Sequence, residues 1–364
     1  MFGAASFLVL SLLAHADGGV EPVALTPVVA PAYTPELGFL VAAGGVVGWS
    51  ADAKSPRSSF TLVGGVSTTG AFLAQGRLTS FFKEDLVRLA ALIDVRDQPD
   101  HFFGVGLENG LTRVQGRDTT AYRRTAWQVN PQLQVKAAPS FFLTSVMDFT
   151  GTLSRSVSAG VESDPDFAGR GGRQILNSGL GLGLTWDSRD VPVNAWKGML
   201  LSVQWIAYGS WLGGTTTWQA FTLDYRHYVT LFGREGTTLC WQLKHRSTWG
   251  DVPWSDLSQV GTPWDLRAYR WGRFRDASAT TALVELRVML PFPKDTLWSR
   301  LGLATWLGVG ALGSGLLPDY TPMNLLPSVG VGLRVRVQDR VTLRLDFGIG
   351  RGSYAFYFQF LEAF

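Results

Sequence analysis

The amino-acid sequence predicts an all-β protein that folds as a transmembrane antiparallel β-barrel. Charged residues make up only 17% of the 364 residues, whereas aromatic residues reach 12% and Gly occurs 42 times. Apolar and polar residues alternate with a period of two, which is the period of a β-strand. The alternating segments are about ten residues long, the length that a tilted strand needs to cross a bilayer.

Four segments show this alternation most clearly. Their alternating apolar residues are Trp127, Val129, Leu133 and Val135; Leu239, Trp241 and Leu243; Val329, Val331, Leu333, Val335 and Val337; and Val341, Leu343, Leu345, Phe347 and Ile349. The positions between them carry Arg, Asp, Gln and Gly, which is typical of a water-filled lumen rather than of the surface of a soluble sandwich. Aromatic residues at segment ends indicate an interfacial girdle. They are Trp186, Trp211, Trp249, Tyr320 and Tyr354.

Fifteen segments have strand character. They span residues 37–49, 58–67, 71–82, 86–96, 121–136, 140–154, 173–187, 198–211, 216–231, 237–249, 280–291, 299–313, 327–338, 340–350 and 353–364. Single-chain bacterial barrels have an even number of strands, so we expect sixteen, with the remaining strand between residues 97 and 120 or just before residue 37. The longest connections, 97–120, 155–172 and 250–279, are expected to be extracellular loops.

The N-terminal residues predict export from the cytoplasm. An apolar run at residues 2–13 is too short to span a bilayer as a helix and precedes Ala-His-Ala at residues 14–16, a cleavage pattern of small residues. We therefore expect a signal peptide at 1–16, a short Pro-rich periplasmic leader at 17–36 and an outer-membrane barrel at 37–364. A short amphipathic core helix is the alternative interpretation of the apolar run.

Motifs for catalysis and for cofactor binding are absent from the sequence. Neither H-E-x-x-H nor G-x-S-x-G occurs, and Cys240 is the single cysteine. Gly179, Gly181 and Gly183 alternate with leucines in a strand instead of opening a helix. The formal charge of +3, without a cluster of Lys or Arg, disfavours nucleic acid as a partner. We expect a protein that is not an enzyme and has no metal or cofactor; an outer-membrane lipid hydrolase is the enzymatic alternative.

Five motifs follow one another from about residue 173 onward. They are T-W-D-S-R-D at 185–190 with Gly198 after it, D-L-R-A-Y at 265–269 continued by G-R-F-R-D at 272–276, V-E-L-R at 284–287, R-L-D-F-G at 344–348 and F-L-E-A-F at 360–364. In this order the motifs resemble those of the outer-membrane surface-antigen superfamily. That superfamily includes the barrel-assembly insertase, the translocation-assembly module and the two-partner secretion transporters.

The resemblance implies that loop 250–279 folds back into the lumen and carries Arg267 and Tyr269 there. The alternation of the strand after the loop puts Glu285 on the lumen side. An arginine in a lumen keeps its charge, so it needs a carboxylate partner or open water. We therefore predict that Glu285 is the main partner of Arg267 and Asp346 a second one. The alternative is an ordinary solvent-exposed arginine.

Two positions depart from the family pattern. Ala268 stands where the loop motif has Gly, and Gly308 stands where a later motif of the family has Asp. Residues 17–36 are too short for one of the family's periplasmic polypeptide-transport-associated (POTRA) domains, so we expect a barrel without them. The resemblance assigns a further set of residues to the family's turn motif. These are Asp187, Arg189, Asp190 and Gly198.

The last strand predicts a C-terminal assembly signal. Its aromatic residues lie on one alternating face, as in outer-membrane barrels whose last strand is recognised by strand addition. They are Tyr354, Phe356, Phe358, Phe360 and Phe364. A plain lipid-facing strand is the alternative, and the two interpretations are compatible.

By resemblance, we expect a function in the insertion or export of proteins, or of lipids, at the outer membrane. A seam between the first and last strands would open, weakened by glycines on both sides. These are Gly44, Gly45, Gly48, Gly348, Gly350 and Gly352. The expected partners are outer-membrane lipids, the barrel-assembly machinery during biogenesis, and a periplasmic partner or client protein. The alternatives are a passive or plugged pore and a structural barrel or adhesin that presents its loops.

Overall fold

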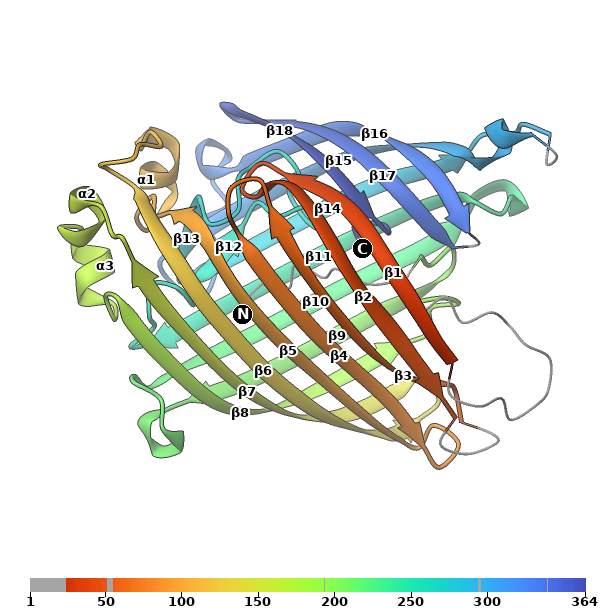
Figure 1. The fold of residues 1–364 in the computed structure, drawn as a ribbon, viewed down its shortest axis with the longest axis horizontal. Helices are drawn as coiled ribbons and strands as arrows, with labels where there is room; N and C mark the ends of the chain where they lie inside the picture. Colours follow the sequence, from red (N-terminus) through yellow and green to blue (C-terminus); the bar gives the residue numbers. More distant parts are fainter. Residues whose placement is uncertain (1–23, 51–54, 193, 294–295, 339) are drawn as a thin grey trace.

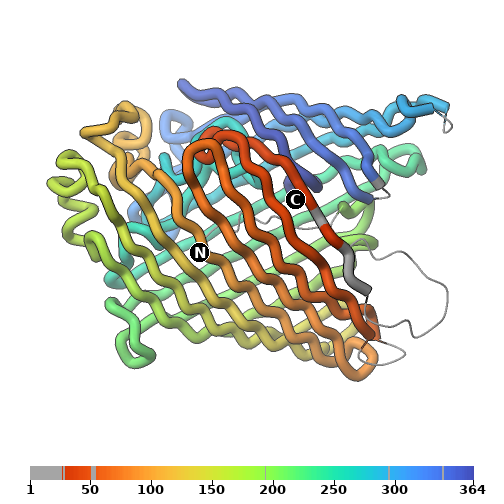
Figure 2. The backbone as a smooth tube through the Cα atoms, viewed as in Figure 1, coloured from red at the N-terminus to blue at the C-terminus, as the bar shows by residue number. Residues whose placement is uncertain are grey.

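Sixteen antiparallel strands close into a barrel in the computed structural model, which describes residues 24–50, 55–192, 194–293, 296–338 and 340–364 (Figure 1). Strands that follow one another in the chain are neighbours in the barrel, and β1 pairs with β18 to close it. Figure 2 shows the tilt of the strands around the barrel. The predicted fold class and strand number are confirmed. The predicted signal peptide lies outside the described residues.

The barrel strands are β1 (Ala24–Thr34), β2 (Gly38–Trp49), β3 (Ser58–Ser67), β4 (Phe72–Phe82), β5 (Val87–His101), β6 (Ala121–Ala138), β7 (Phe141–Arg155), β8 (Gln174–Asp187), β9 (Gly198–Tyr208), β10 (Trp218–Thr230), β11 (Thr237–Gly250), β14 (Ser278–Met289), β15 (Leu301–Gly313), β16 (Leu326–Gln338), β17 (Val341–Gly350) and β18 (Ser353–Phe360). The connections contain α1 (Leu107–Thr112), α2 (Ala159–Glu162), α3 (Pro165–Gly169), the short strands β12 (Ser258–Val260) and β13 (Phe274–Asp276), and the 3₁₀ turns η1 (Ser210–Leu212), η2 (Leu231–Gly233), η3 (Leu297–Arg300) and η4 (Pro322–Asn324). None of the helices in the described ranges is long and apolar enough to span a membrane.

Strand β1 lies inside the segment that was predicted to be a leader. It pairs with β2 along its whole length, from Ala24 to Thr34. The sixteenth strand therefore lies just before residue 37, one of its two predicted places, and the leader prediction is wrong for residues 24–34. Pro27 and Pro31 interrupt the alternation that identifies a strand. They are tolerated because proline lacks an N–H group, which an edge strand with one well-paired neighbour does not need at every position.

The seam between β1 and β18 is short. In the described residues its register consists of the pair Tyr33 and Phe358, whereas β1 and β2 are paired over the full strand. The glycines that were predicted to weaken the seam lie one strand away from it, because Gly44 is on β2 and Gly348 is on β17. The prediction that glycines line the seam is therefore wrong; what distinguishes the seam in the described residues is its short register.

The two faces of the strands differ as the alternation predicted. On β6, Trp127 and Leu133 face outward and are 39% and 46% exposed, whereas Gln128 faces the lumen and is 4% exposed. Residues on one face of a strand recur every second position, so this phase holds along the strand. The outer surface of the barrel is therefore apolar and the lumen is polar.

The longest connections gather at one end of the barrel, which we call the long-loop end; the opposite end is the short-turn end. They are residues 102–120, 156–173 and 251–277, and helices α1, α2 and α3 lie in the first two (Figure 1). Trp254 packs edge-on against Phe102 and Tyr122, with ring centroids 5.3 and 5.6 Å apart. This apolar cluster joins the three loops at the long-loop end.

Candidate functional site

Loop 251–277 enters the lumen and brings Arg267 against two carboxylates. The Nη1 atom of Arg267 donates to Asp346 Oδ2 on β17 at 2.9 Å, and its Nη2 atom donates to Glu285 on β14. All three side chains are fully buried, and the guanidinium also lies 3.8 Å from the ring centroid of Trp306. The two partners that were predicted for Arg267 are therefore both in contact with it, and Arg267 is not a solvent-exposed arginine.

Further charged side chains extend this contact into a network. Arg334 on β16 donates to Asp346 Oδ1 at 2.6 Å, and Arg344 on β17 donates to Asp346 Oδ2 at 2.6 Å. Arg287 on β14 donates to Glu285 Oε1 at 2.6 Å. We call the following residues the lumen ion-pair network: Arg267, Arg287, Arg334, Arg344, Glu285, Asp346 and Glu362. Buried charges of this kind are tolerated because each has partners, and removal of one partner costs about 3–5 kcal/mol.

Local sequence explains how the loop reaches this position. The carboxylate of Asp265 accepts hydrogen bonds from the backbone N–H groups of Gly261, Thr262 and Leu266, at 3.2, 2.6 and 2.5 Å, which stabilises a tight turn just before Arg267. Gly348 on β17 lets the loop backbone approach, because a Cβ atom there would collide with the carbonyl oxygen of Arg267.

The two departures from the family pattern both fit this geometry. Ala268 is not among the residues with positive φ, so alanine is accommodated where the family has glycine. At Gly308, an added Cβ would lie 3.2 Å from a methyl group of Leu266, so the position faces an apolar loop residue rather than the arginine. Asp346 and Glu285 supply the carboxylates for Arg267 instead.

Tyr269 fixes the loop to the last three strands. Its hydroxyl donates to the carbonyl of Pro327 on β16 at 2.5 Å and accepts from the backbone N–H of Arg351 at 2.7 Å. Its own carbonyl accepts from the hydroxyl of Tyr357 on β18 at 3.3 Å. Arg267 and Tyr269, two residues apart in the loop, thus contact neighbouring strands.

The turn motif lies at the short-turn end, between β8 and β9. Arg189 pairs with Asp187 at 2.8 Å, and Gly198 has a φ of 97°, which favours glycine. Asp190 accepts from the N–H of Trp196 at 3.0 Å and pairs with Arg340, on the turn between β16 and β17, at 3.0 Å. Burial alone would raise the pKa of Asp190, but these donors hold it below its ordinary value.

The aromatic residues of the predicted assembly signal do not all lie on one face of the barrel. Tyr354 and Phe356 face outward on β18, but Leu361, with a φ of 65°, turns the chain into the lumen. Phe364 is buried there, with its ring 5.1 Å from the guanidinium carbon of Arg287. The prediction that Phe364 continues the outward aromatic face is therefore wrong.

Glu362 explains this turn of the chain. Its carboxylate accepts from Arg334 Nε at 2.9 Å and from Thr342 Oγ1 at 2.7 Å, so it joins the lumen ion-pair network. A carboxylate that faced lipid would lack such partners and would be costly. Sequence reasoning did not assign Glu362, Arg334 or Arg344 to the site, although alternation placed the two arginines on the polar face.

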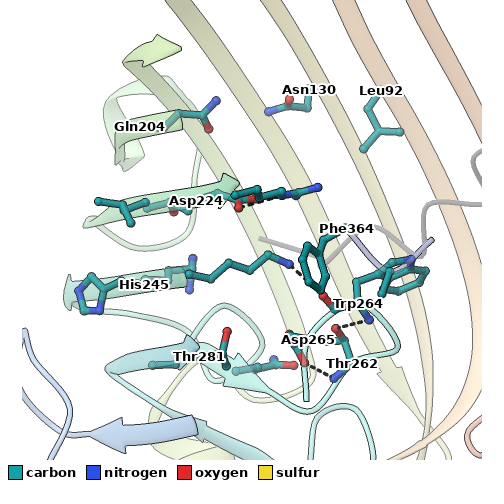
Figure 3. Close-up of a pocket in the computed structure, with 18 of the residues that line it drawn as sticks. Leu92, Asn130, Gln204, Asp224, His245, Thr262, Trp264, Asp265, Thr281 and Phe364 are labelled. Atoms are coloured by element: carbon teal, nitrogen blue, oxygen red, sulfur yellow. Dashed lines mark hydrogen bonds and ion pairs between the residues drawn. The ribbon is translucent and has the colours of Figure 1, made fainter. Parts of the chain in front are cut away.

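A cavity of about 440 Å³ remains in the lumen, lined by the loop, by residues on strands between β5 and β14 and by the C-terminal residues 360–364. Figure 3 shows Asn130, Gln204 and Asp224 on the wall side and Trp264 on the loop side. Asp224 is paired with Arg226 at 2.6 Å. The wall side of the cavity is polar and carries charges of both signs. Because this space remains, the loop does not fill the lumen completely.

Comparisons with known proteins agree with this geometry. The Omp85 superfamily domain matches residues 105–364, and no curated protein sequence matches the chain significantly. The solved structure of BamA from Haemophilus ducreyi lacking POTRA domains 1–3 is 15% identical with a TM-score of 0.64, over 94% of this chain and 70% of that chain.

Two further solved structures share the fold. CdiB from Escherichia coli is 10% identical with a TM-score of 0.56, over 94% of this chain and 68% of that chain. CdiB from Acinetobacter baumannii is 12% identical with a TM-score of 0.54, over 93% of this chain and 59% of that chain. The resemblance that the motif order indicated is confirmed. The chain is an outer-membrane β-barrel and belongs to the Omp85 superfamily.

Proposed function

We propose that the protein inserts or exports proteins, or lipids, at the outer membrane by opening the seam between β1 and β18. Membership in the Omp85 superfamily and the likeness of the barrel to BamA and CdiB support a barrel of insertase or transporter type. This role requires a strand edge and a path through the wall rather than a catalytic group. Its partners would be membrane lipids and a client protein.

The short pairing at the seam is the observation that carries this proposal. Tyr33 and Phe358 form the register pair between the two strands in the described residues, whereas β17 and β18 are paired from Leu343 and Phe360 to Gly350 and Ser353. Unpaired N–H and C=O groups on a strand edge bind an added strand of another chain. An edge that is already largely unpaired costs little to expose, so it suits the reception of a client strand.

A reversible crosslink across the seam tests the proposal. Tyr33→Cys and Phe358→Cys, in a Cys240→Ser background, place two thiols on directly opposite residues, about 4.5–5.5 Å apart at Cα, within reach of a disulfide. The assay would measure assembly of a denatured barrel client into proteoliposomes by its protection from protease. We expect oxidation to abolish assembly and reduction to restore it.

The matched control is a second disulfide within the first hairpin. Ala30→Cys and Ala42→Cys pair β1 with β2, away from the seam. Oxidation of this pair should leave client assembly unchanged. Full activity of the oxidised seam pair would rule out lateral opening.

A plugged pore is the second candidate function, favoured by the way the loop fills one side of the lumen. Arg267 and Leu266 are fully buried, and the cluster around Trp254 packs the three long loops together at the long-loop end. Planar-bilayer conductance of the intact protein and of a deletion of residues 262–276 separates the two functions. Closure that the deletion relieves, in a protein that assembles no client, would favour the plugged pore.

A further inference from the structure

Four successive residues of loop 251–277 straddle the seam. Ala268 and Tyr269 contact the side formed by β16 to β18, whereas Arg270 and Trp271 contact the turn between β1 and β2. The two sides of the seam are the two ends of the barrel sheet, joined in the described residues by the pair Tyr33 and Phe358.

On the β18 side, the loop is held by hydrogen bonds to two residues of that strand. The hydroxyl of Ser353 donates to the carbonyl of Ala268 at 2.7 Å, and the hydroxyl of Tyr357 donates to the carbonyl of Tyr269 at 3.3 Å. Tyr357 is fully buried, so its bond is shielded from water.

On the β1 side, the loop is held by the turn that follows the strand. The backbone N–H of Trp271 donates to Glu36 Oε1 at 2.9 Å, and Arg270 Nη2 donates to the carbonyl of Pro35 at 2.6 Å. The bond from Arg270 is charge-assisted, because a guanidinium is ionised at neutral pH. Such a bond is stronger than a hydrogen bond between two neutral groups.

We infer that residues 268–271 form a latch that holds β1 against β18 at the long-loop end, and that Glu36 is the residue through which the β1 side is held. The bonds to Glu36 and Pro35 on one side and to Ser353 and Tyr357 on the other supply the links that strand pairing does not supply at the seam. This inference rests on the proposed opening of the seam, which the latch would regulate.

The latch and the lumen ion-pair network act on different parts of the barrel. Arg267 joins the loop to β14 and β17, which both lie on the β18 side of the seam in the barrel order. Loss of Glu36 therefore weakens the link to the β1 edge, leaving the bond from Arg270 to Pro35, while the loop stays docked. Loss of Asp346 loosens the loop itself. The two substitutions should be separable by experiment.

Distance measurements between spin labels test the latch without any client protein. Phe39→Cys on β2 and Tyr354→Cys on β18, both outward-facing and exposed, carry the labels in a Cys240→Ser background. In proteoliposomes, we expect Glu36→Ala to lengthen the mean distance across the seam and to broaden its distribution. Glu36→Gln keeps an oxygen that accepts from Trp271, so its shift should be smaller.

Glu108→Ala is the matched control, because Glu108 is an exposed carboxylate on α1 in another loop of the same end. It should leave the distance unchanged. Ser353→Ala removes a bond from the β18 side and gives a second measurement if Glu36→Ala fails to fold; it should also broaden the distribution. Unchanged distances in the folded Glu36→Ala protein, or in Ser353→Ala if that variant is the one that folds, overturn the latch.

The distances also separate the two proposals from each other. A wider seam in Glu36→Ala with client assembly still active after the oxidation of Tyr33→Cys with Phe358→Cys would retain the latch and overturn the proposed function. Unchanged distances together with assembly that oxidation blocks would retain the proposed function and overturn the latch.

Discussion

The two halves of the barrel wall are built differently. In β5 to β8, strand pairing continues over most of each strand, as in the register from Val87 and Val135 to His101 and Ala121. Around β1 and β18 the pairing is reduced to Tyr33 and Phe358 in the described residues. The loop docks on β14 to β18, and a cavity remains against strands between β5 and β14. The comparison teaches that the loop contacts the part of the wall that ends at the seam, where the sheet is paired least.

The largest expected effect comes from the loss of a shared carboxylate on the loop-bound half. Asp346→Ala leaves Arg267, Arg334 and Arg344 without a common partner, so we expect the free energy of unfolding to fall by about 3–5 kcal/mol. Asp224→Ala on the other half breaks a part-exposed pair with Arg226 and should cost on the order of 1 kcal/mol. Urea unfolding in liposomes measures both. Equal losses would contradict the comparison.

A smaller effect is expected when Arg267 is replaced by lysine, which keeps the positive charge but lacks the planar guanidinium group. Arg267→Lys cannot bind Asp346 and Glu285 at once with a planar fork, so we expect a loss of about 2 kcal/mol in the free energy of unfolding. Lys244→Arg, on the cavity side, should change stability little, because Lys244 is held by the carbonyl of Trp264 at 3.5 Å rather than by a carboxylate fork. A tolerated Arg267→Lys would show that charge alone docks the loop.

The short-turn end provides a test away from both halves. Arg340→Ala removes a pair with Asp190 that is part-exposed, so we expect a loss of about 1 kcal/mol or less. Amide exchange should quicken at Trp196 and Lys197, whose N–H groups bind Asp190. Arg336→Ala is the control, because Arg336 donates to Ser299 instead. Equal amide exchange rates in both variants would show that Arg340 does not stabilise the turn.

The smallest effect is a pH dependence at the seam. Burial raises the pKa of Glu36, and the Trp271 N–H and the charge of Arg270 oppose this only in part; Tyr357 and Thr34 also face the carboxyl. The docked form therefore binds the proton more tightly than a form with Glu36 in water. Docking strengthens as pH falls through the raised pKa and weakens as pH rises.

Spin-label distances across the seam measure this dependence. The distribution should narrow between neutral pH and pH values near the ordinary pKa of a glutamate, about 4.3. Glu36→Gln should remove the dependence. A distribution that widens on acidification would reverse the sign that we derive from burial.

Strand alternation was enough to predict the barrel and the direction of most side chains, as for Gln128 and Trp127. With a period of two, only one question remains for each strand, namely which alternating set of side chains faces the lumen. The same rule could not delimit β1, which the even strand number placed just before residue 37 or between residues 97 and 120. Pro27 and Pro31 interrupt the pattern there although backbone pairing persists. A strand is defined by its backbone hydrogen bonds, whereas a sequence pattern reflects only the side chains. The bounds of β1 are therefore set by its backbone pairing with β2.

The candidate site was predictable where a motif and the strand phase agreed. Arg267, Glu285 and Asp346 were brought together in this way. Arg334 and Glu362 were not, since nothing in the sequence says which of the lumen-facing residues of a barrel pair with one another. Glu362 also depends on the left-handed conformation of Leu361, which leucine seldom adopts and which no local pattern indicates.

The unequal charges of the lumen ion-pair network bear on ion selectivity. With the loop docked, Arg267, Arg287, Arg334 and Arg344 face Glu285, Asp346 and Glu362, an excess of one positive charge. Withdrawal of the loop removes Arg267 and leaves equal numbers of both signs on the vacated wall. An open lumen would then discriminate between cations and anions through the residues of the opposite wall, such as Asp224 and Lys244.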